Sequence, residues 1–561
     1  MVLAEWILAI LYFIGGLNDL FMDLVYYIEP LRRRIAQGRE NPVATPEELY
    51  GIPEQPIAIL IPAWDESAVI GAMLESTCTR LDYSNYDIFV GTYPNDEATQ
   101  MEVARAAFDR PHVHKVVCPN DGPTSKADCL NWIVEAIKLK ERETGKRYAI
   151  FALQDAEDVV HPLTLRVFNR FVPEYDLIQI PVIPYERYLH KLTGGTYLDE
   201  FAEVHLKNLD ARLAVGGMVP SAGVGTAFGR EACDELAAQT NHILFPPVSL
   251  TEDYDFSFRL FRNGRKSGLA KVWVLNDANP NHRYEELVAI REFFPANFAD
   301  AVRQKQRWVL GITFQGWEKL GWGKTWRERY MLLRDRIGVL TSLLNAVTLF
   351  ILMSVSEAIA WALANHRVWN ADLGRYHFFG TLSVLIDVNI GLLCFRVVQR
   401  ALCVKEVARR RQMIMVPFRL LWSNVIDFYC TIHAARRYTS SRITGRPLKW
   451  LKTAHEFPNM EQLLRTHRQL GDLLMERRLI TPAQLTDALA TQRWQGAKRV
   501  PLGEILLAIP AITPEQLDET LAIQSRSRLR VKEAVEAELA DQPIMARRDD
   551  SALDKIGRAH V

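Results

Sequence analysis

The chain has little cysteine: seven residues in 561, with no CxxC pair. This excludes a disulfide-stapled scaffold and a conventional zinc site, and it is typical of a protein kept in a reducing compartment. The formal net charge is zero, since 67 Lys and Arg balance 67 Asp and Glu. This balance argues against a protein whose main partner is nucleic acid. Neither a Walker A motif nor GxGxxG occurs, so nucleoside triphosphatases and dinucleotide oxidoreductases lose support.

Long apolar runs are few, but three of them, 6–28, 337–356 and 377–395, are long enough to cross a bilayer. We expect an N-terminal transmembrane helix within 1–30 and two more within a membrane region at 335–440. The first run is a poor signal peptide, because residues 1–5 contain no Lys or Arg. Core helices of a soluble protein are the alternative.

A fourth apolar run, 413–435, has basic residues on both sides. If it spanned the bilayer, one basic flank would lie outside, against the positive-inside rule. We therefore expect an interfacial helix on the cytoplasmic face, with a spanning helix as the alternative.

Between the membrane segments, residues 40–330 alternate short apolar strands with helical stretches. This pattern predicts an α/β domain with a mainly parallel sheet. We expect strands at 57–62, 88–92 and 148–153, and a helix that opens at residues 65–67.

Acidic residues follow each of these three predicted strands, at the edge where open α/β sheets bind ligands. A single Asp there is usually a helix cap, but Asp155 and Glu157 lie two apart. They could converge on Mg²⁺ or Mn²⁺ shared with substrate phosphates. Lys126 could pair with a phosphate, or it could be a solvated loop lysine.

Five motifs resemble, in order, those of the processive family-2 glycosyltransferases, which include cellulose, chitin and hyaluronan synthases. They are Ile61-Pro62-Ala63-Trp64-Asp65-Glu66, Asn95-Asp96, Asp155-Ala156-Glu157, Thr251-Glu252-Asp253 (TED), and Gln304-Lys305-Gln306-Arg307-Trp308, which fits QxxRW. The third matches the metal-binding DxD with Glu in the last position. TED and QxxRW directly before an apolar run are the most specific part of the match.

This resemblance implies a GT-A-type domain that transfers a hexosyl or N-acetylhexosaminyl group, with inversion, from a UDP-linked sugar. It implies that Asp253 is the catalytic base, that Glu252 and Trp308 meet the acceptor, and that Asp155 and Glu157 hold Mg²⁺ or Mn²⁺. The nucleotide sugar would be bound by Asp65, Glu66, Asp96, Lys126, Asp155, Gln304 and Arg307. The stretch 221–228 resembles the acceptor-side loop of these enzymes, although a tight turn explains it equally well.

Residues 464–527 contain two units that repeat at a spacing of 32 residues, each with a Thr-Pro that predicts a helix start. They resemble the N-terminal domain of secretion and pilus ATPases, which binds cyclic di-GMP in some members. The resemblance implies ligand contacts at Gly471, Leu474, Gln492, Gly503, Leu506 and Gln524. Gln469 and Pro501 stand where that family has arginine, so a helical repeat for protein docking stays open.

The order of transferase, membrane helices and repeat is similar to that of a family of inner-membrane proteins required for bacteriophage adsorption. It implies a multi-pass synthase that makes and exports an exopolysaccharide, with cytoplasmic catalytic and C-terminal domains and cyclic di-GMP as allosteric ligand. It also implies an outer-membrane partner through which polymer leaves and phage attaches. A non-catalytic receptor or scaffold with a decayed transferase domain, and a short-chain glycolipid synthase, are the alternatives.

The tail, residues 528–561, is charged and receives no predicted fold. Residues 555–561 match what a sequencing adapter encodes in one reading frame. We therefore expect the natural protein to continue beyond about Asp554.

Overall fold

The computed structural model describes residues 2–37, 46–241, 243–247, 249–276, 284–364, 381–446, 448 and 456–457, together with single positions and short stretches between 470 and 521. The chain divides into two units. The first is Met1–Val274 with Glu286–Phe457, and the second is Leu275–Glu285 with Pro458–Val561.

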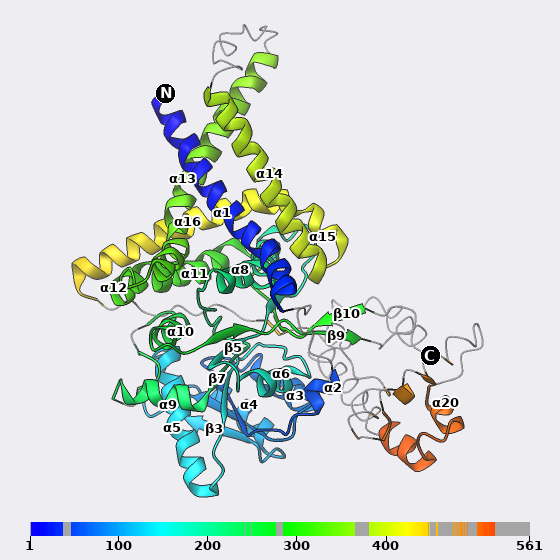
Figure 1. The fold of residues 1–561 in the computed structure, drawn as a ribbon. Coiled ribbons are helices and arrows are strands. Elements are labelled where there is room, and N and C mark those ends of the chain that lie inside the picture. Colours follow the sequence, from blue (N-terminus) through cyan, green and yellow to red (C-terminus); the bar gives the residue numbers. More distant parts are fainter. Residues whose placement is uncertain are drawn as a thin grey trace, which may run out of the picture. The chain divides into compact units, whose positions relative to one another are not determined.

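A seven-stranded sheet with the order β3-β2-β1-β4-β7-β5-β8 is the centre of the first unit (Figure 1). Strand β7 is antiparallel to β4 and β5, and the other neighbours are parallel, so the predicted mainly parallel sheet is confirmed. The strands are β1 (Ile57–Pro62), β2 (Tyr86–Thr92), β3 (Val113–Val117), β4 (Ile150–Leu153), β5 (Leu177–Gln179), β7 (Thr226–Gly229) and β8 (Ser267–Leu269). Smaller ladders join β6 (Val182–Pro184) to β11 (Ile290–Glu292) and β9 (Trp273–Asn276) to β10 (Tyr284–Leu287).

Both faces of this sheet are buried. Along β1, Ile57, Ile59 and Ile61 belong to one hydrophobic cluster, whereas Ala58 and Leu60 belong to another. Successive side chains of a strand point to opposite faces, so an uninterrupted apolar run fills two cores at once.

Helices cover the two faces of the sheet, and the same unit also contains several long helices (Figure 1). The helices around the sheet are α2 (Pro46–Tyr50), α3 (Ile70–Arg80), α4 (Glu97–Ala107), α5 (Lys126–Thr144), α6 (Thr164–Phe171), α9 (Arg230–Ala238) and α10 (Glu252–Arg262). The remaining ones are α1 (Val2–Gln37), α7 (Leu192–Glu203), η1 (Val204–Asn208), α8 (Leu209–Ala214), α11 (Phe298–Trp308), η2 (Val309–Gln315), α12 (Gly316–Leu320), α13 (Trp326–Ala364), α14 (Thr381–Val407), α15 (Arg410–Ile414) and α16 (Val416–Thr444), where η marks a π-helix.

One helix start was predicted too early. We expected a helix to open at residues 65–67, but α3 begins at Ile70. Asp65 has a positive φ of 53°, which no helix allows, and its N–H donates to Asp96 Oδ2 at 2.5 Å. The acidic residues after β1 therefore form a turn that a second loop holds in place.

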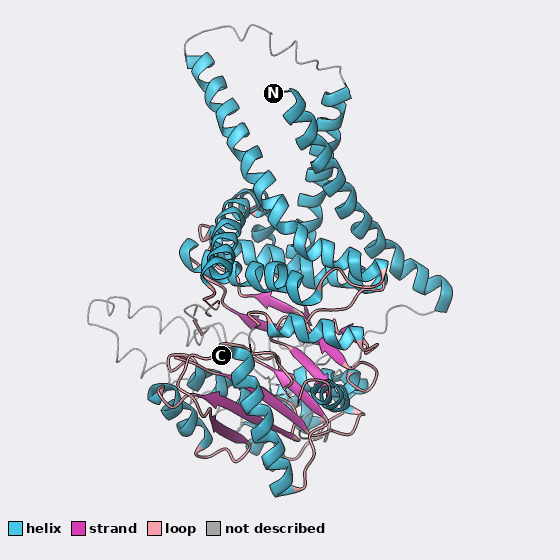
Figure 2. Cartoon of the chain, turned by 90° about the vertical axis from the view of Figure 1, so that its left-hand side faces the viewer, coloured by secondary structure: helices cyan, strands magenta, loops and turns pink. Residues whose placement is uncertain are grey.

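Three long helices, α1, α13 and α14, project from the part of the unit that contains the sheet (Figures 1 and 2). By length and hydropathy, Glu5–Glu29 and Thr381–Val407 could each cross a membrane. Helix α13 contains the 337–356 run and exposes Leu340, Val347 and Phe350. Helix α16 lies crosswise to these three helices (Figure 1). This orientation favours the interfacial helix predicted for 413–435, which stays a prediction.

A row of charges on α7 and η1, buried except for the partly exposed Glu200, ties the long helices to the domain. Each member of the row has a partner on a different helix within 3 Å: Asp199 with Arg419, Glu200 with Lys305, Glu203 with Arg400, and Lys207 with Asp23. The Asp199–Arg419 pair is bidentate, with oxygen–nitrogen distances of 2.7 and 2.9 Å, and its two side chains are 2% and 1% exposed.

In the second unit, the two repeats pack on a shared core. Each predicted helix start is confirmed as a reciprocal cap: Thr481 N–H donates to Gln484 Oε1 at 2.8 Å, and Thr513 N–H to Gln516 Oε1 at 2.9 Å. Helix α20 (Leu502–Ala508) contributes Ile505 and Leu506 to the core, and the first repeat contributes Leu474, Ile480, Leu485 and Ala488.

Packing accounts for three of the residues that we expected to bind cyclic di-GMP. Leu474 and Leu506 are fully buried in the shared core, so neither offers an exposed wall to a guanine. A Cβ on Gly503 would lie 2.8 Å from Leu517 Cδ1, so this glycine allows the close approach of Leu517. Gly471, Gln492 and Gln524, like the tail 528–561, lie outside the described residues, and cyclic di-GMP binding stays a prediction.

The Asp199–Arg419 pair gives a stability prediction. Arg419→Met leaves a buried carboxylate without its partner, so we expect a loss of about 3–5 kcal/mol, whereas the double variant Asp199→Leu/Arg419→Met should recover most of it. Thermal unfolding of the detergent-solubilised protein measures both. Arg436→Met, at an exposed position of the same helix, is the control. Equal unfolding temperatures for Arg419→Met and wild type would contradict the prediction.

Candidate active site

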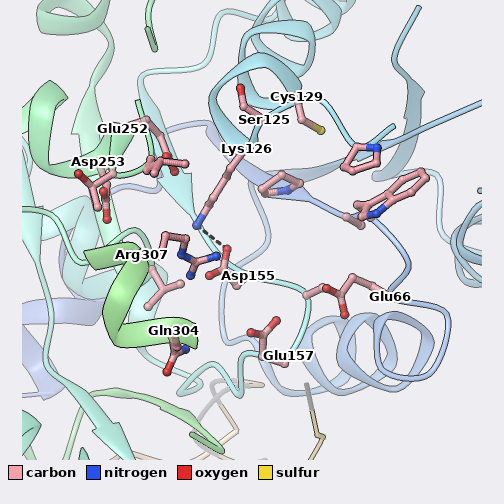
Figure 3. Close-up of a pocket in the computed structure, with 18 of the residues that line it drawn as sticks. Glu66, Ser125, Lys126, Cys129, Asp155, Glu157, Glu252, Asp253, Gln304 and Arg307 are labelled. Atoms are coloured by element: carbon pink, nitrogen blue, oxygen red, sulfur yellow. Dashed lines mark ion pairs between the residues drawn. The ribbon is translucent and has the colours of Figure 1, made fainter. Parts of the chain in front are cut away.

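A pocket opens beyond the carboxyl ends of β1 and β4, at the sheet edge predicted to bind ligands (Figure 3). Its walls come from loops after these strands, the N-termini of α5 and α10, and helix α11. Nine predicted site residues line it: Glu66, Lys126, Asp155, Glu157, Glu252, Asp253, Gln304, Arg307 and Trp308. The tertiary structure thus brings four of the five motifs to one cavity.

Lys126 is the cation at the centre of this pocket. It is the first residue of α5, which Ser125 caps by accepting the Asp128 N–H at 3.1 Å. Its Nζ lies 2.6 Å from Asp155 Oδ1 and 3.3 Å from the Gly223 carbonyl oxygen. Burial alone would lower the pKa of Lys126, but Asp155, Glu252 and Asp253 raise it, so the ammonium stays charged.

Glu252 and Asp253 begin α10, and both face the pocket. The Tyr254 N–H donates to Asp253 Oδ1 at 2.8 Å and so orients the carboxylate. Burial raises the pKa of Asp253; burial and the charge of Asp253 raise the pKa of Glu252 to about 7. A carboxylate with a raised pKa is a better proton acceptor, which suits the predicted base.

Gly223, in the stretch 221–228, lies against these charges. It has a φ of 81°, a conformation that favours glycine, and a Cβ there would lie 2.8 Å from Asp253 Oδ2 and 3.3 Å from Lys126 Nζ. The absence of a side chain at Gly223 therefore lets the backbone approach Lys126 and Asp253 closely. Whether this loop contacts an acceptor stays a prediction.

Helix α11 presents the QxxRW side chains on one face, because Gln304, Arg307 and Trp308 are three and four residues apart. Gln304 Oε1 is buried without a hydrogen-bond partner within the described part of the chain. The Trp308 ring lies 6.1 Å, between centroids, from both Tyr197 and Phe201. This end of the pocket therefore combines an unused acceptor atom with an aromatic wall.

Asp155 and Glu157 follow β4 and supply the carboxylates at the other side of the pocket. Asp158 is fully buried and accepts the Asp155 N–H at 2.8 Å, which holds this turn. Burial, and then the nearby Glu292, raise the pKa of Asp158 well above its usual range. The described residues contain no group of three or more His, Cys, Asp and Glu placed to hold a metal ion. Two carboxylates are nevertheless the donor set that Mg²⁺ uses when substrate phosphates complete its shell.

Two predicted nucleotide-binding residues, Asp65 and Asp96, do not line the pocket. Asp96 instead caps α4 by accepting the Thr99 N–H at 3.2 Å, and it also accepts the Asp65 N–H. These two residues shape the loop that carries Trp64 and Glu66, which do line the pocket.

Sequence reasoning missed several lining residues. Trp64 and Tyr93 meet edge to face at 5.2 Å, and both lie within or beside motifs that were recognised. Glu292 and Phe294 carry no sequence signal, because they reach the pocket through the pairing of β11 with β6.

The model of the glycosyltransferase like family 2 matches residues 53–311. Bacteriophage adsorption protein B of Escherichia coli K12 is 40% identical over 490 residues, which cover 86% of this chain and 66% of that protein. Bacteriophage N4 adsorption protein B of Escherichia coli O157:H7 matches with the same figures. The chain thus spans just under two thirds of the length of these curated relatives.

Among solved structures, a mannosyltransferase from Pyrobaculum calidifontis in complex with GDP-Man and Mn²⁺ is 15% identical, with a TM-score of 0.41 over 75% of this chain and 99% of that one. The S. aureus TarS 1–349 structure is 10% identical, with a TM-score of 0.30 over 70% of this chain and 92% of that one. These scores are too low to assign a function. Residues 53–311 therefore belong to the glycosyltransferase like family 2, with the GT-A-type fold predicted from sequence, and the chain as a whole is a relative of bacteriophage adsorption protein B.

Proposed function

We propose that this chain is an inverting glycosyltransferase of the bacterial inner membrane, which extends an exopolysaccharide from a UDP-linked sugar on the cytoplasmic side. One observation carries the proposal: a charged lysine, six carboxylates and the QxxRW side chains converge on a single pocket although they come from distant parts of the chain. Such a convergence supports catalysis over the alternative of a receptor with a decayed transferase domain, because a decayed site need not keep its carboxylates together.

The pocket provides a group for each part of an inverting transfer. The Asp253 carboxylate takes the proton of the acceptor hydroxyl, whose oxygen attacks the anomeric carbon. The bond from that carbon to the diphosphate breaks, and the diphosphate leaves with the electron pair. Lys126 and Arg307 neutralise this departing charge, and Trp308 offers an apolar face to the acceptor sugar.

Asp155 and Glu157 would hold the Mg²⁺ or Mn²⁺ that the family resemblance implies. A bound divalent cation would stabilise the leaving diphosphate electrostatically. In the structure the Asp155 carboxylate pairs with the Lys126 ammonium, which places the proposed metal ligand next to the cation that would face the phosphates.

For the whole protein we further propose that it makes a polymer, that the polymer is exported, and that synthesis is regulated. Membrane helices next to the QxxRW segment support a long polymer over a short glycolipid. The similarity to bacteriophage adsorption protein B supports an outer-membrane partner for export and phage attachment. Cyclic di-GMP as the regulator rests on the repeat pattern alone.

The experiment that tests the activity incubates membranes containing the protein with a panel of radiolabelled nucleotide sugars and sizes the products. We expect one donor to label a high-molecular-weight polymer. Labelled lipid of low molecular weight would support the alternative of a short-chain glycolipid synthase. An absence of transfer from every donor would support the alternative of a non-catalytic receptor.

Asp253→Asn tests the base. The amide keeps the size of the side chain but cannot take a proton, so we expect transfer to fall about 100- to 10,000-fold while binding of the nucleotide sugar stays nearly unchanged. Asp255→Asn is the matched control, because Asp255 lies on the same helix, pairs with Arg259 and does not line the pocket. Full turnover by Asp253→Asn would contradict the assignment of Asp253 as the catalytic base.

The metal site is tested by binding as well as by activity. We expect Asp155→Ala/Glu157→Ala to lose transfer and to lose Mn²⁺ binding measured by electron paramagnetic resonance. Asp109→Ala changes an exposed carboxylate on the surface and should keep both. Metal-dependent transfer that persists in the double variant would place the cation elsewhere.

The pH profile reports the coupling of the two carboxylates. Asp253 must be ionised to act, so transfer should be lost as pH falls through its raised pKa. Because the charge of Asp253 raises the pKa of Glu252, Glu252 is protonated while Asp253 titrates, so Glu252→Gln should leave the acid limb of kcat in place. An acid limb that moves to lower pH would show that Glu252 is charged when Asp253 ionises.

A further inference from the structure

The TED segment is held on both sides by the chain that follows QxxRW. On its N-terminal side, the Leu250 N–H donates to Gln315 Oε1 at 3.0 Å. Thr251 packs on Gly311, where a Cβ would lie 2.4 Å from Thr251 Oγ1. Gln315 and Gly311 both belong to the π-helix η2, a helix type found often at functional sites.

On its C-terminal side, Tyr254 contacts Asp335, the tenth residue of helix α13. The Tyr254 hydroxyl donates to Asp335 Oδ2 at 2.6 Å. Arg212 donates to both oxygens of the same carboxylate, at 2.6 and 2.9 Å, and so fixes its orientation. Asp335 lies two residues before the apolar run 337–356, so this anchor lies where α13 enters its apolar part.

A second attachment follows along the same two helices. Arg262, at the end of α10, lies 2.6 Å from Glu328 Oε1, near the start of α13. The two contacts are eight residues apart on α10 and seven apart on α13, which is about two helical turns on each. Helix α10 is thus fastened to α13 near both of its ends.

We infer that Gln315 and Asp335 are positioning residues for the base Asp253, holding the turn Leu250–Tyr254 from η2 and from helix α13. The link to the base is direct, because both contacts are made by Tyr254. Its N–H donates to Asp253, and its hydroxyl donates to Asp335. A misplacement of about 1 Å at a reacting group can cost about 100-fold in rate. This inference rests on the proposed function.

Two variants loosen the turn without touching the pocket. Tyr254→Phe removes only the hydroxyl that Asp335 accepts, and Gln315→Met removes the acceptor for the Leu250 N–H. Neither residue lines the pocket. We expect each to lower kcat about 10- to 100-fold with KM and the dissociation constant for the nucleotide sugar nearly unchanged.

Tyr83→Phe is the matched control. Its hydroxyl donates to the Gln55 carbonyl oxygen at 2.7 Å, between the segments that precede β1 and β2, and Tyr83 does not line the pocket. A general loss of packing would lower the unfolding temperature of all three variants alike, whereas the positioning role lowers kcat only in Tyr254→Phe and Gln315→Met.

The outcomes separate the two proposals. If the wild type transfers sugar and both variants turn over at the wild-type rate, the positioning role is overturned and the proposed function stands. If kcat and nucleotide-sugar binding fall together, the residues support the fold of the pocket and the positioning role is again overturned. If the wild type transfers no sugar from any donor, the proposed function fails and the inference falls with it.

Discussion

The row of charges on α7 and η1 is the constraint on which the rest of the first unit depends. An unpaired charge in a protein interior costs several kcal/mol, so each member of the row must meet its partner whenever the protein is folded. The partners lie on α1, α11, α14 and α16, so α7 and η1 together constrain the positions of four other helices. Apolar packing alone would allow such helices to slide, because hydrophobic contacts have no preferred direction.

Lys305 shows how this row reaches the pocket. It lies inside the QxxRW motif but points away from the cavity, toward Glu200 on α7 and Asp427 on α16. Gln304 and Arg307 face the pocket from the same helix. The buried pairs therefore set the rotation of α11 about its axis, and with it the direction of the motif's polar side chains.

The pocket itself is organised around an excess of negative charge. Lys126 and Arg307 are the cations of its lining, and they face Glu66, Asp155, Glu157, Glu252, Asp253 and Glu292. Such an arrangement suits a ligand that arrives as a diphosphate with a divalent cation, because the cation offsets carboxylates that would otherwise repel the phosphates. The raised pKa values of Glu252 and Asp253 follow from the same crowding and burial.

The sequence alone determined the parallel sheet, the apolar helices, the paired repeat and the motifs that meet in the pocket, because strand periodicity, apolar run length and short motifs are local properties. It did not determine that α3 begins at Ile70, since a contact with Asp96, 31 residues away, holds Asp65 out of a helix. Nor did it assign a role to Glu292 or Asp335, and it placed Leu506 at a ligand site. The first enters the pocket through strand pairing, the second fastens the TED turn, and the third packs in the core of the repeat. These roles depend on residues that meet only after folding, so only the tertiary structure could decide them.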